Sequence, residues 1–166
     1  MALIGDRYEV VTDVSYFMNA TATRGGCASL YTAGSGAALD QSAAEVRYIA
    51  TPSGYAPVGI LLNDVVNLDL TRQHLNQHKN EVQQGQKVTL LTEGWCVTDM
   101  VYTGITPAAH DACYVGLSGY LTTAAVANDQ SNANTDVPIG RFMSTKDEDG
   151  FVKVYVKLPA GGKPTA

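Results

Sequence analysis

The run from Phe151 to Leu158 limits the fold of this chain more than any other feature. Apolar side chains recur in it at every second position, and lysine or aromatic side chains occupy the positions between. The apolar set is Val152, Val154, Val156 and Leu158, and the set between includes Lys153 and Lys157. Alternate residues of a β-strand point to opposite faces, so this period of two predicts a half-buried strand. The preceding Asp149-Gly150 predicts a hairpin turn, because glycine adopts a positive φ at no steric cost.

Short runs of the same kind, separated by turn residues, continue through the chain from residue 45 onward. We predict strands at residues 46–50, 58–62, 87–92, 95–102, 112–115, 120–123 and 138–143. Turns are expected at Glu93-Gly94 and at residues 117–119, and an exposed loop at residues 128–136. Residues 68–82 fit either a helix or a long polar connection. This pattern of strands and turns predicts an all-β fold, a small antiparallel β-barrel or sandwich.

Residues 14–39 differ from the rest of the chain. Arg24 is their single charged residue, and Ala, Gly, Ser and Thr dominate the segment. One interpretation is an extended arm that becomes ordered only against a partner; the other is an irregular but packed stretch of the domain. We favour the arm, because so little apolar surface does not offset the entropy of ordering the segment. The predicted organisation is therefore an extended, irregular N-terminal arm at residues 1–44, an antiparallel β domain at 45–159 and a flexible tail at 160–166.

The charge content narrows the range of partners. Charged residues are 16% of the 166 residues and the net charge is −5, whereas about a quarter of an average soluble domain is charged. No basic run is present, so we expect no nucleic-acid partner and no binding to an anionic membrane. No apolar run approaches the length of a membrane span. Low surface charge favours a permanent interface with another protein, because exposed uncharged surface is unusual for a monomer.

Residues with metal-binding chemistry lack the spacing of a metal site. His74 and His78 are four apart, as in a helical zinc site, but position 75 is not the glutamate of the HExxH pattern. The acids at 147–149 are consecutive and precede an apolar strand, whereas a calcium loop supplies oxygens at alternate positions. We therefore predict no metal site and no cofactor, and interpret residues 147–150 as a solvated hairpin turn.

The candidate nucleophiles likewise lack the sequence pattern of a catalytic site. Ser118 lies in a Gly-Leu-Ser-Gly-Tyr sequence that differs from the GxSxG nucleophile elbow at its last position, and no helical pattern follows. His110 and Cys113 lack a neighbour that would orient the imidazole. The three cysteines, Cys27, Cys96 and Cys113, have no CxxC spacing and are expected to be reduced and packed. We predict no catalytic residue and no enzymatic activity.

Several segments between Gly59 and Pro159 together point to a family. They are Gly59 to Val66, Arg72 to His74, Asn80 to Val82, Gly85 to Trp95, Pro107 to Tyr114, Ile139 to Phe142, Asp147 to Gly150 and Val154 to Pro159. In their glycine and turn placements these segments resemble the head decoration, or cement, proteins of tailed bacteriophages. The resemblance covers about 100 residues and includes little of residues 1–45.

The resemblance implies a structural virion protein. Such a protein binds the outer surface of the assembled capsid, bridges neighbouring major capsid proteins and stabilises the head against internal DNA pressure. It also implies a homo-oligomer, a dimer or trimer, and the first seven residues lack a secretory signal, so we expect synthesis in the host cytoplasm. We expect partner contacts from Tyr16, Phe17, Arg24, Leu30, Tyr31, Arg72, His74 and His78.

The alternative function is a virion or surface β module that binds a glycan or receptor through its aromatic residues. Such residues are frequent in the predicted strands: Trp95, Tyr102, Tyr114, Tyr120, Phe142, Phe151 and Tyr155. Aromatic side chains at this density can form a sugar-binding face. Packing in the core and across strands is the interpretation that we favour for a small β domain.

Overall fold

The computed structural model describes residues 3–4, 11–32, 44–52, 54–64, 80–123 and 137–158. Within these residues the secondary structure consists of β-strands and one 3₁₀ turn, η1 (Leu117–Gly119), so the predicted all-β fold is confirmed. The strands are β1 (Leu3–Ile4), β2 (Val11–Asp13), β3 (Phe17–Met18), β4 (Ala22–Thr23), β5 (Cys27–Thr32), β6 (Glu45–Arg47), β7 (Pro57–Asp64), β8 (Glu81–Val82), β9 (Val88–Thr98), β10 (Ala112–Val115), β11 (Leu121–Thr122), β12 (Gly140–Phe142) and β13 (Val152–Lys157). No helix of the described residues has the length and apolar character needed to cross a membrane.

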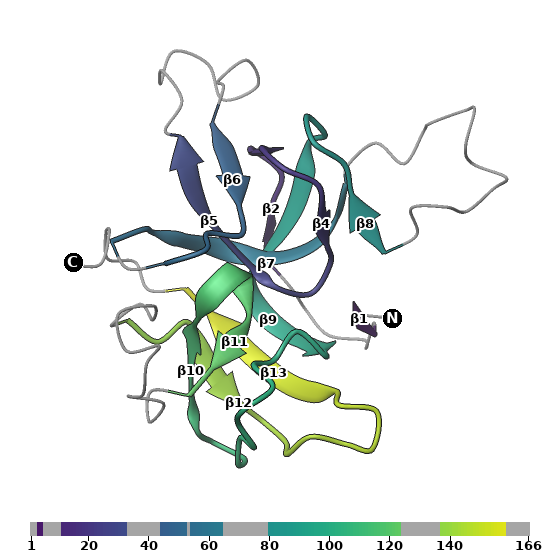
Figure 1. Cartoon of the computed structure of the whole chain (residues 1–166), viewed down its shortest axis with the longest axis vertical. Coiled ribbons are helices and arrows are strands. Elements are labelled where there is room, and N and C mark those ends of the chain that lie inside the picture. Colours follow the sequence, from purple (N-terminus) through teal and green to yellow (C-terminus); the bar gives the residue numbers. More distant parts are fainter. Residues whose placement is uncertain are drawn as a thin grey trace, which may run out of the picture.

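One large sheet holds most of the strands. Its order is β11-β10-β12-β13-β9-β7-β5-β6-β3, and β1 and β2 also pair with β9, while β4 and β8 form a separate pair. The neighbours β3 and β6 are parallel, so the sheet is mixed rather than antiparallel throughout. Figure 1 shows an upper half around β5 and β6 and a lower half around β10 to β13, with β9 running through both. Within the described residues the sheet is not closed into a barrel.

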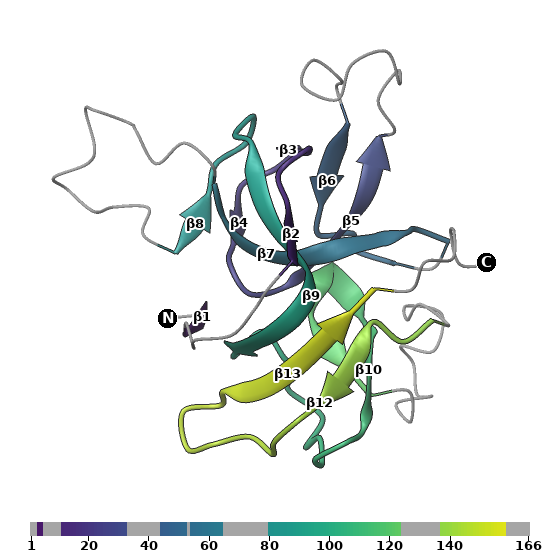
Figure 2. The same ribbon diagram turned by 180° about the vertical axis from the view of Figure 1, so that it is seen from behind.

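β9 spans a position where the sequence predicts a turn. Residues 88–98 form one continuous strand, so the turn expected at Glu93-Gly94 is wrong. Gly94 has a φ of 140°, a conformation that residues with side chains rarely adopt, and it still pairs with Val156 of β13. A glycine inside a strand often marks a bend rather than an end. Here it allows β9 to leave the upper half and continue into the lower half (Figure 2).

Two hydrophobic cores lie on opposite faces of the central strands. The lower core is formed by Cys27, Ile60, Leu91, Cys96, Val101, Ile105, Cys113, Val115, Leu121, Ile139, Phe142, Val152, Val154 and Val156. The upper core is formed by Met18, Ala28, Val46, Leu61, Val82, Val88 and Leu90. Consecutive residues of β5, β7 and β9 thus enter different cores, because neighbouring side chains of a strand point to opposite faces. These three strands are buried on both faces where the halves meet.

The segment that the sequence analysis favoured as an arm forms part of this sheet. Residues 11–32 contain β2 to β5, and β5 lies between β7 and β6. Met18, Cys27 and Ala28 are fully buried. Residues 11–32 are therefore packed into the domain here, as in the alternative interpretation, and do not form an extended arm. The strand β5 gains two hydrogen-bonded neighbours, which compensates for its small side chains. The domain limits at 45 and 159 and the tail at 160–166 stay predictions.

The closing hairpin has the predicted form. β12 pairs with β13, and Val152, Val154 and Val156 are fully buried. In the connecting turn Gly150 has a φ of 85°, and Asp147 Oδ1 accepts hydrogen bonds from the backbone N–H groups of Asp149 and Phe151, at 3.1 and 2.7 Å. The carboxylate is therefore a turn-forming group, in agreement with the interpretation of residues 147–150 as a hairpin turn.

Tyr48 joins the two halves of the molecule. Its hydroxyl donates to the carbonyl of Thr23 at 2.6 Å and accepts from the backbone N–H of Gly26 at 3.0 Å. Its ring lies so close to Gly119 of η1 that a Cβ built there would be 2.7 Å from two ring atoms. Burial is the main reason that the pKa of Tyr48 is raised well above its ordinary value. Since β6 precedes Tyr48 and η1 belongs to the lower half, this ring fixes one half on the other.

Candidate docking surface

The predicted contact residues fall into three groups. Phe17, Leu30 and Tyr31 belong to strands of the upper half, Tyr16 precedes β3, and Arg24 lies between β4 and β5. The remaining predicted residues, Arg72, His74 and His78, lie outside the residues that the structure describes. The structure therefore does not place the whole predicted set on one surface.

Tyr31 is the most exposed of the predicted aromatic residues. Its side chain is 41% exposed, at the end of β5 where the strand leaves the core. The guanidinium carbon of Arg47 lies 3.8 Å from the centroid of the Tyr31 ring. This is a cation–π stack, which is stabilised by the negative face of the ring. Because Arg47 belongs to β6, the register of β5 on β6 creates the pair.

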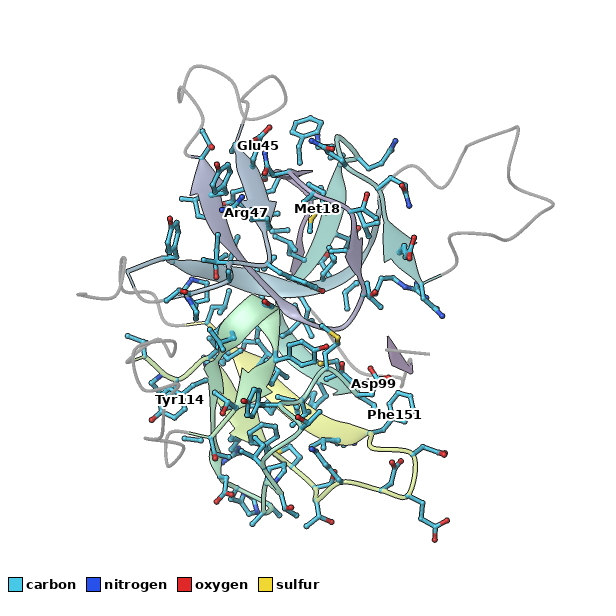
Figure 3. All side chains as sticks on the ribbon, viewed as in Figure 1. Met18, Glu45, Arg47, Asp99, Tyr114 and Phe151 are labelled. Atoms are coloured by element: carbon cyan, nitrogen blue, oxygen red, sulfur yellow. The ribbon has the colours of Figure 1, made fainter. Side chains whose placement is uncertain are left out.

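Phe17 is part of the same end of the upper half. It pairs with Glu45 of β6 and forms an isolated bridge with Lys87, just before β9. The Lys87 ammonium lies 5.8 Å from the centroid of the Phe17 ring. We name Phe17, Tyr31, Glu45, Arg47 and Lys87 the upper rim. Figure 3 shows Glu45 and Arg47 at the upper end of the molecule, distant from Tyr114 and Phe151 in the lower half.

Tyr16, Leu30 and Arg24 have mainly structural surroundings. Tyr16 packs against the upper core, and burial, followed by the nearby carboxylate of Asp13, raises the pKa of its hydroxyl. Leu30 is half-buried on β5. Arg24 Nη2 donates to Asn80 Oδ1 at 3.0 Å, and its backbone N–H donates to the Asn80 carbonyl at 2.9 Å. Arg24 therefore fixes the chain before β8 and is not part of the upper rim.

Sequence reasoning did not select Arg47, Lys87 or Ser29. The alternation of residues 46–50 indicates that Arg47 points away from the Val46 face, but many exposed arginines have this pattern. Ser29 is polar and only 1% exposed, and it pairs with Arg47 across β5 and β6. Only the pairing of strands places these side chains beside Tyr31, so a local sequence signal for this set does not exist.

Other exposed groups lie elsewhere on the surface. Val11 and Val14, in and beside β2, are 58% and 45% exposed. Tyr120 is 36% exposed and lines a pocket of about 300 Å³ between the halves. The pocket is lined by Met18, Ala20, Thr21, Ala22, Thr23, Tyr48, Met100, Ser118 and Tyr120. Its lining contains no charged side chain.

A comparison with known protein families identifies the family of this chain. Residues 5–157 match the model of a family described as structural cement protein (E217 gp24/Pam3 gp6). The chain belongs to this family. The matched range includes β2 to β5, so it also covers the segment that the resemblance from Gly59 onward left out. Membership assigns a structural, capsid-stabilising role in the phage virion. A search of curated proteins found no match.

The candidate nucleophile of this cement protein is enclosed. Cys113 is fully buried, and burial raises the pKa of its thiol well above the ordinary value. His110 is exposed, has a φ of 75°, and its backbone N–H donates to the Phe142 carbonyl at 2.7 Å. A neutral thiol without solvent access is inert as a nucleophile. Family membership likewise implies a non-enzymatic role.

The remaining chemical groups also have structural surroundings. The three cysteines are free and buried, as expected. Among the described residues no group of three or more His, Cys, Asp or Glu side chains is arranged to hold a metal ion. Trp95 and Tyr155 pack across β9 and β13 with ring centroids 4.9 Å apart, and Phe142 is fully buried in the lower core.

Proposed function

We propose that this cement protein binds the outer surface of the assembled capsid and bridges neighbouring major capsid proteins. By bridging them it stabilises the head against the pressure of the packaged DNA. The proposal extends the capsid-stabilising role of the family to a location and a mechanism. The observation that supports it most is the distribution of exposed apolar and aromatic side chains over separate strands of one body.

Three surfaces are available for such contacts. Tyr31 lies at the end of β5, Val11 and Val14 lie in and beside β2, and Tyr120 precedes β11. In the sheet, β5 and β11 are separated by five other strands. A subunit with surfaces this far apart in the sheet can contact two neighbours at once. Aromatic residues and arginine are enriched at the energetic centres of protein interfaces, and the upper rim presents both.

The internal construction suits a load-bearing role. β9 contributes residues to both cores, and Tyr48 of the upper half packs on η1 of the lower half. Pulling the two halves apart therefore requires breaking strand pairing and core packing together. A bridge across two capsid subunits transmits force through these contacts. Repetition of a modest interface over many equivalent sites of a symmetric shell adds up to a large stabilisation.

We also propose that the protein acts as a homo-oligomer, a dimer or trimer. The low charge content and the exposed Val11 and Val14 support self-association, since apolar surface of this kind is stabilised by being covered. Sedimentation analysis of the purified protein measures the oligomer directly. A monomer at all concentrations up to those used for decoration would contradict this part.

The experiment that tests the bridging role uses heads that lack the protein. Purified protein is added to expanded heads, and a cryo-EM map locates it on the shell. We expect density on the outer surface that contacts at least two major capsid subunits. The same heads are heated with and without the protein, and release of packaged DNA is followed with an intercalating dye. Density confined to one capsid subunit, or unchanged DNA release, would contradict the proposal.

A further inference from the structure

The outward face of the lower half gathers aromatic and basic side chains. In β9, β12 and β13 the residues that alternate with those of the lower core point to the opposite side of the sheet. Direct cross-strand pairing places Trp95, Tyr155 and Arg141 in one row on that side. We define the lower outer face as these three residues together with Glu93, Lys153 and Lys157. In Figure 2 the three strands lie on the near side of the lower half.

The lower outer face is positively charged, although the protein as a whole is negatively charged. It has three cationic side chains and one carboxylate, which give it a net charge of +2. Because the whole chain has a net charge of −5, the remaining residues together carry −7. The one carboxylate, Glu93, is paired with Lys157, with Oε1 and Nζ 3.5 Å apart. Arg141 is exposed, with its guanidinium carbon 5.7 Å from the centroid of the Tyr155 ring, so its charge is accessible to a partner.

Trp95 and Tyr155 form the aromatic centre of the same face. Their ring centroids are 4.9 Å apart, and both residues are only half-buried although their strands lie in the middle of the sheet. Val11, which is 58% exposed, pairs with Glu93 at the border of the face. Tryptophan, tyrosine and arginine are the residue types that are most enriched at the energetic centres of protein interfaces. The lower outer face therefore has the composition of a protein contact.

The turn between β12 and β13 has the opposite charge. Asp147, Glu148 and Asp149 are consecutive, and all three are exposed. The ammonium of the preceding Lys146 donates to the Tyr102 carbonyl at 3.1 Å. No salt bridge joins Glu148 or Asp149 to a cation of the described residues. Because the three carboxylates repel one another, a cation brought from outside the turn stabilises them.

We propose that the lower outer face of one subunit binds the acidic hairpin tip, residues 147–149, of a second copy of this chain. The inference rests on the proposed function, which includes a homo-oligomer, and it names the two surfaces that join the subunits. The cations of the face contact the carboxylates of the tip. The rings of Trp95 and Tyr155 pack against Phe151, which is half-buried beside the tip. Each subunit gives one tip and receives one, in a dimer or in a closed trimer.

Charge favours this arrangement over direct pairing of two identical faces. Two lower outer faces placed against each other bring like charges together, which is unfavourable. The acidic tip against the face brings opposite charges together and also fixes the orientation of the two subunits. Exposed ion pairs contribute little affinity by themselves. The aromatic centre therefore supplies most of the affinity, and the charges select the surface that binds to it.

Exchange of charge between the two surfaces tests the contact in the full-length protein. The face variant is Arg141→Glu with Lys153→Glu, and the tip variant is Glu148→Lys with Asp149→Lys. Asp147 is kept, because its carboxylate forms the turn. The exchange variant carries all four substitutions and therefore has the net charge of the wild type. Sedimentation equilibrium measures the concentration at which half of each protein is dissociated, and circular dichroism checks that each variant is folded.

We expect each double variant to raise the half-dissociation concentration about tenfold or more, because like charges then meet at the contact. The exchange variant should return to within about threefold of the wild type. The tip variant brings the net charge closer to zero, which by itself favours association, so weaker association there reports the local contact. Glu81→Lys changes an exposed acid of the upper half in the same direction and should behave like the wild type. If a double variant fails to fold, Arg141→Glu and Glu148→Lys decide singly, each with an expected loss of at least about threefold.

Several results would overturn the inference while leaving the bridging role intact. One is a wild-type oligomer whose face and tip variants dissociate within twofold of the wild type. Another is an exchange variant that stays as dissociated as the double variants. Loss of head binding by the face variant, with the oligomer unchanged, would assign the face to an acidic surface of the capsid instead. A wild type that is monomeric at all concentrations would contradict the homo-oligomer of the proposed function as well as this contact.

Discussion

Gly119 offers the sharpest test of how the two halves are joined. It lies in η1 with a φ of 78°, and a Cβ added there would be 2.7 Å from Cγ and Cδ1 of Tyr48 and 2.9 Å from the Cys27 carbonyl oxygen. Gly119→Ala therefore carries two costs. A residue with a side chain in the left-handed region costs about 1–2 kcal/mol. Forcing a carbon against a packed ring and a backbone oxygen adds about 1–3 kcal/mol.

The control substitution separates these costs. Gly85 has nearly the same φ, 80°, but a Cβ there would meet no atom within 4 Å. Gly85→Ala therefore loses only the conformational part, about 1–2 kcal/mol of the free energy of unfolding. We expect Gly119→Ala to lose about 2–5 kcal/mol in total. For a chain of this size, that corresponds to a fall in Tm of roughly 4–20 °C.

Urea unfolding followed by tryptophan fluorescence and circular dichroism measures both variants. The slope of the free energy against urea must match that of the wild type for the comparison to hold. Equal destabilisation by Gly119→Ala and Gly85→Ala would refute the reasoning, because the contact with Tyr48 would then contribute nothing. A larger effect at Gly85 would refute it equally.

Three further predictions concern the same interior. Tyr48→Phe removes the donor to the Thr23 carbonyl and leaves the N–H of Gly26 without its acceptor, so we expect a loss of about 2–4 kcal/mol in urea unfolding. Tyr155→Phe is the control, since its hydroxyl donates a long hydrogen bond, 3.4 Å, to the partly exposed carboxylate of Glu93. A loss of stability as large as that of Tyr48→Phe would contradict the prediction. Deletion of residues 1–32 removes β5 from between β6 and β7, and we expect a chain without dispersed amide NMR signals; a folded domain would restore the arm interpretation. Burial raises the pKa of the thiols of Cys27 and Cys96 from 9.0 to about 12, so the stability from neutral thiols is complete below pH 9 and falls as the pH rises toward 12. The native protein should therefore not react with a thiol reagent at pH 8, and rapid labelling without denaturant would contradict this.

The closing hairpin was predictable because its information is local. Alternation at 152–156 and the glycine at 150 each act within a few residues, and the structure has both features as predicted. β9 was not predictable in the same way. Glu93-Gly94 has the composition of a turn, yet β13 and β2 both pair with this region and hold it in a strand. Tertiary pairing overrides a local turn preference when both sides of the backbone gain hydrogen-bond partners.

Three properties could be predicted from the sequence alone: the all-β class, the location of most strands, and a likeness to cement proteins based on glycine and turn placements. These properties depend on the order of residue types along the chain. The place of residues 11–32 in the sheet depends instead on tertiary contacts, because small residues such as Cys27 and Ala28 show no period when each faces a different core. The same holds for the upper rim. Arg47 and Tyr31 are 16 residues apart in sequence, and they meet only because β5 pairs with β6 and a register shift lies between Leu30 and Thr32.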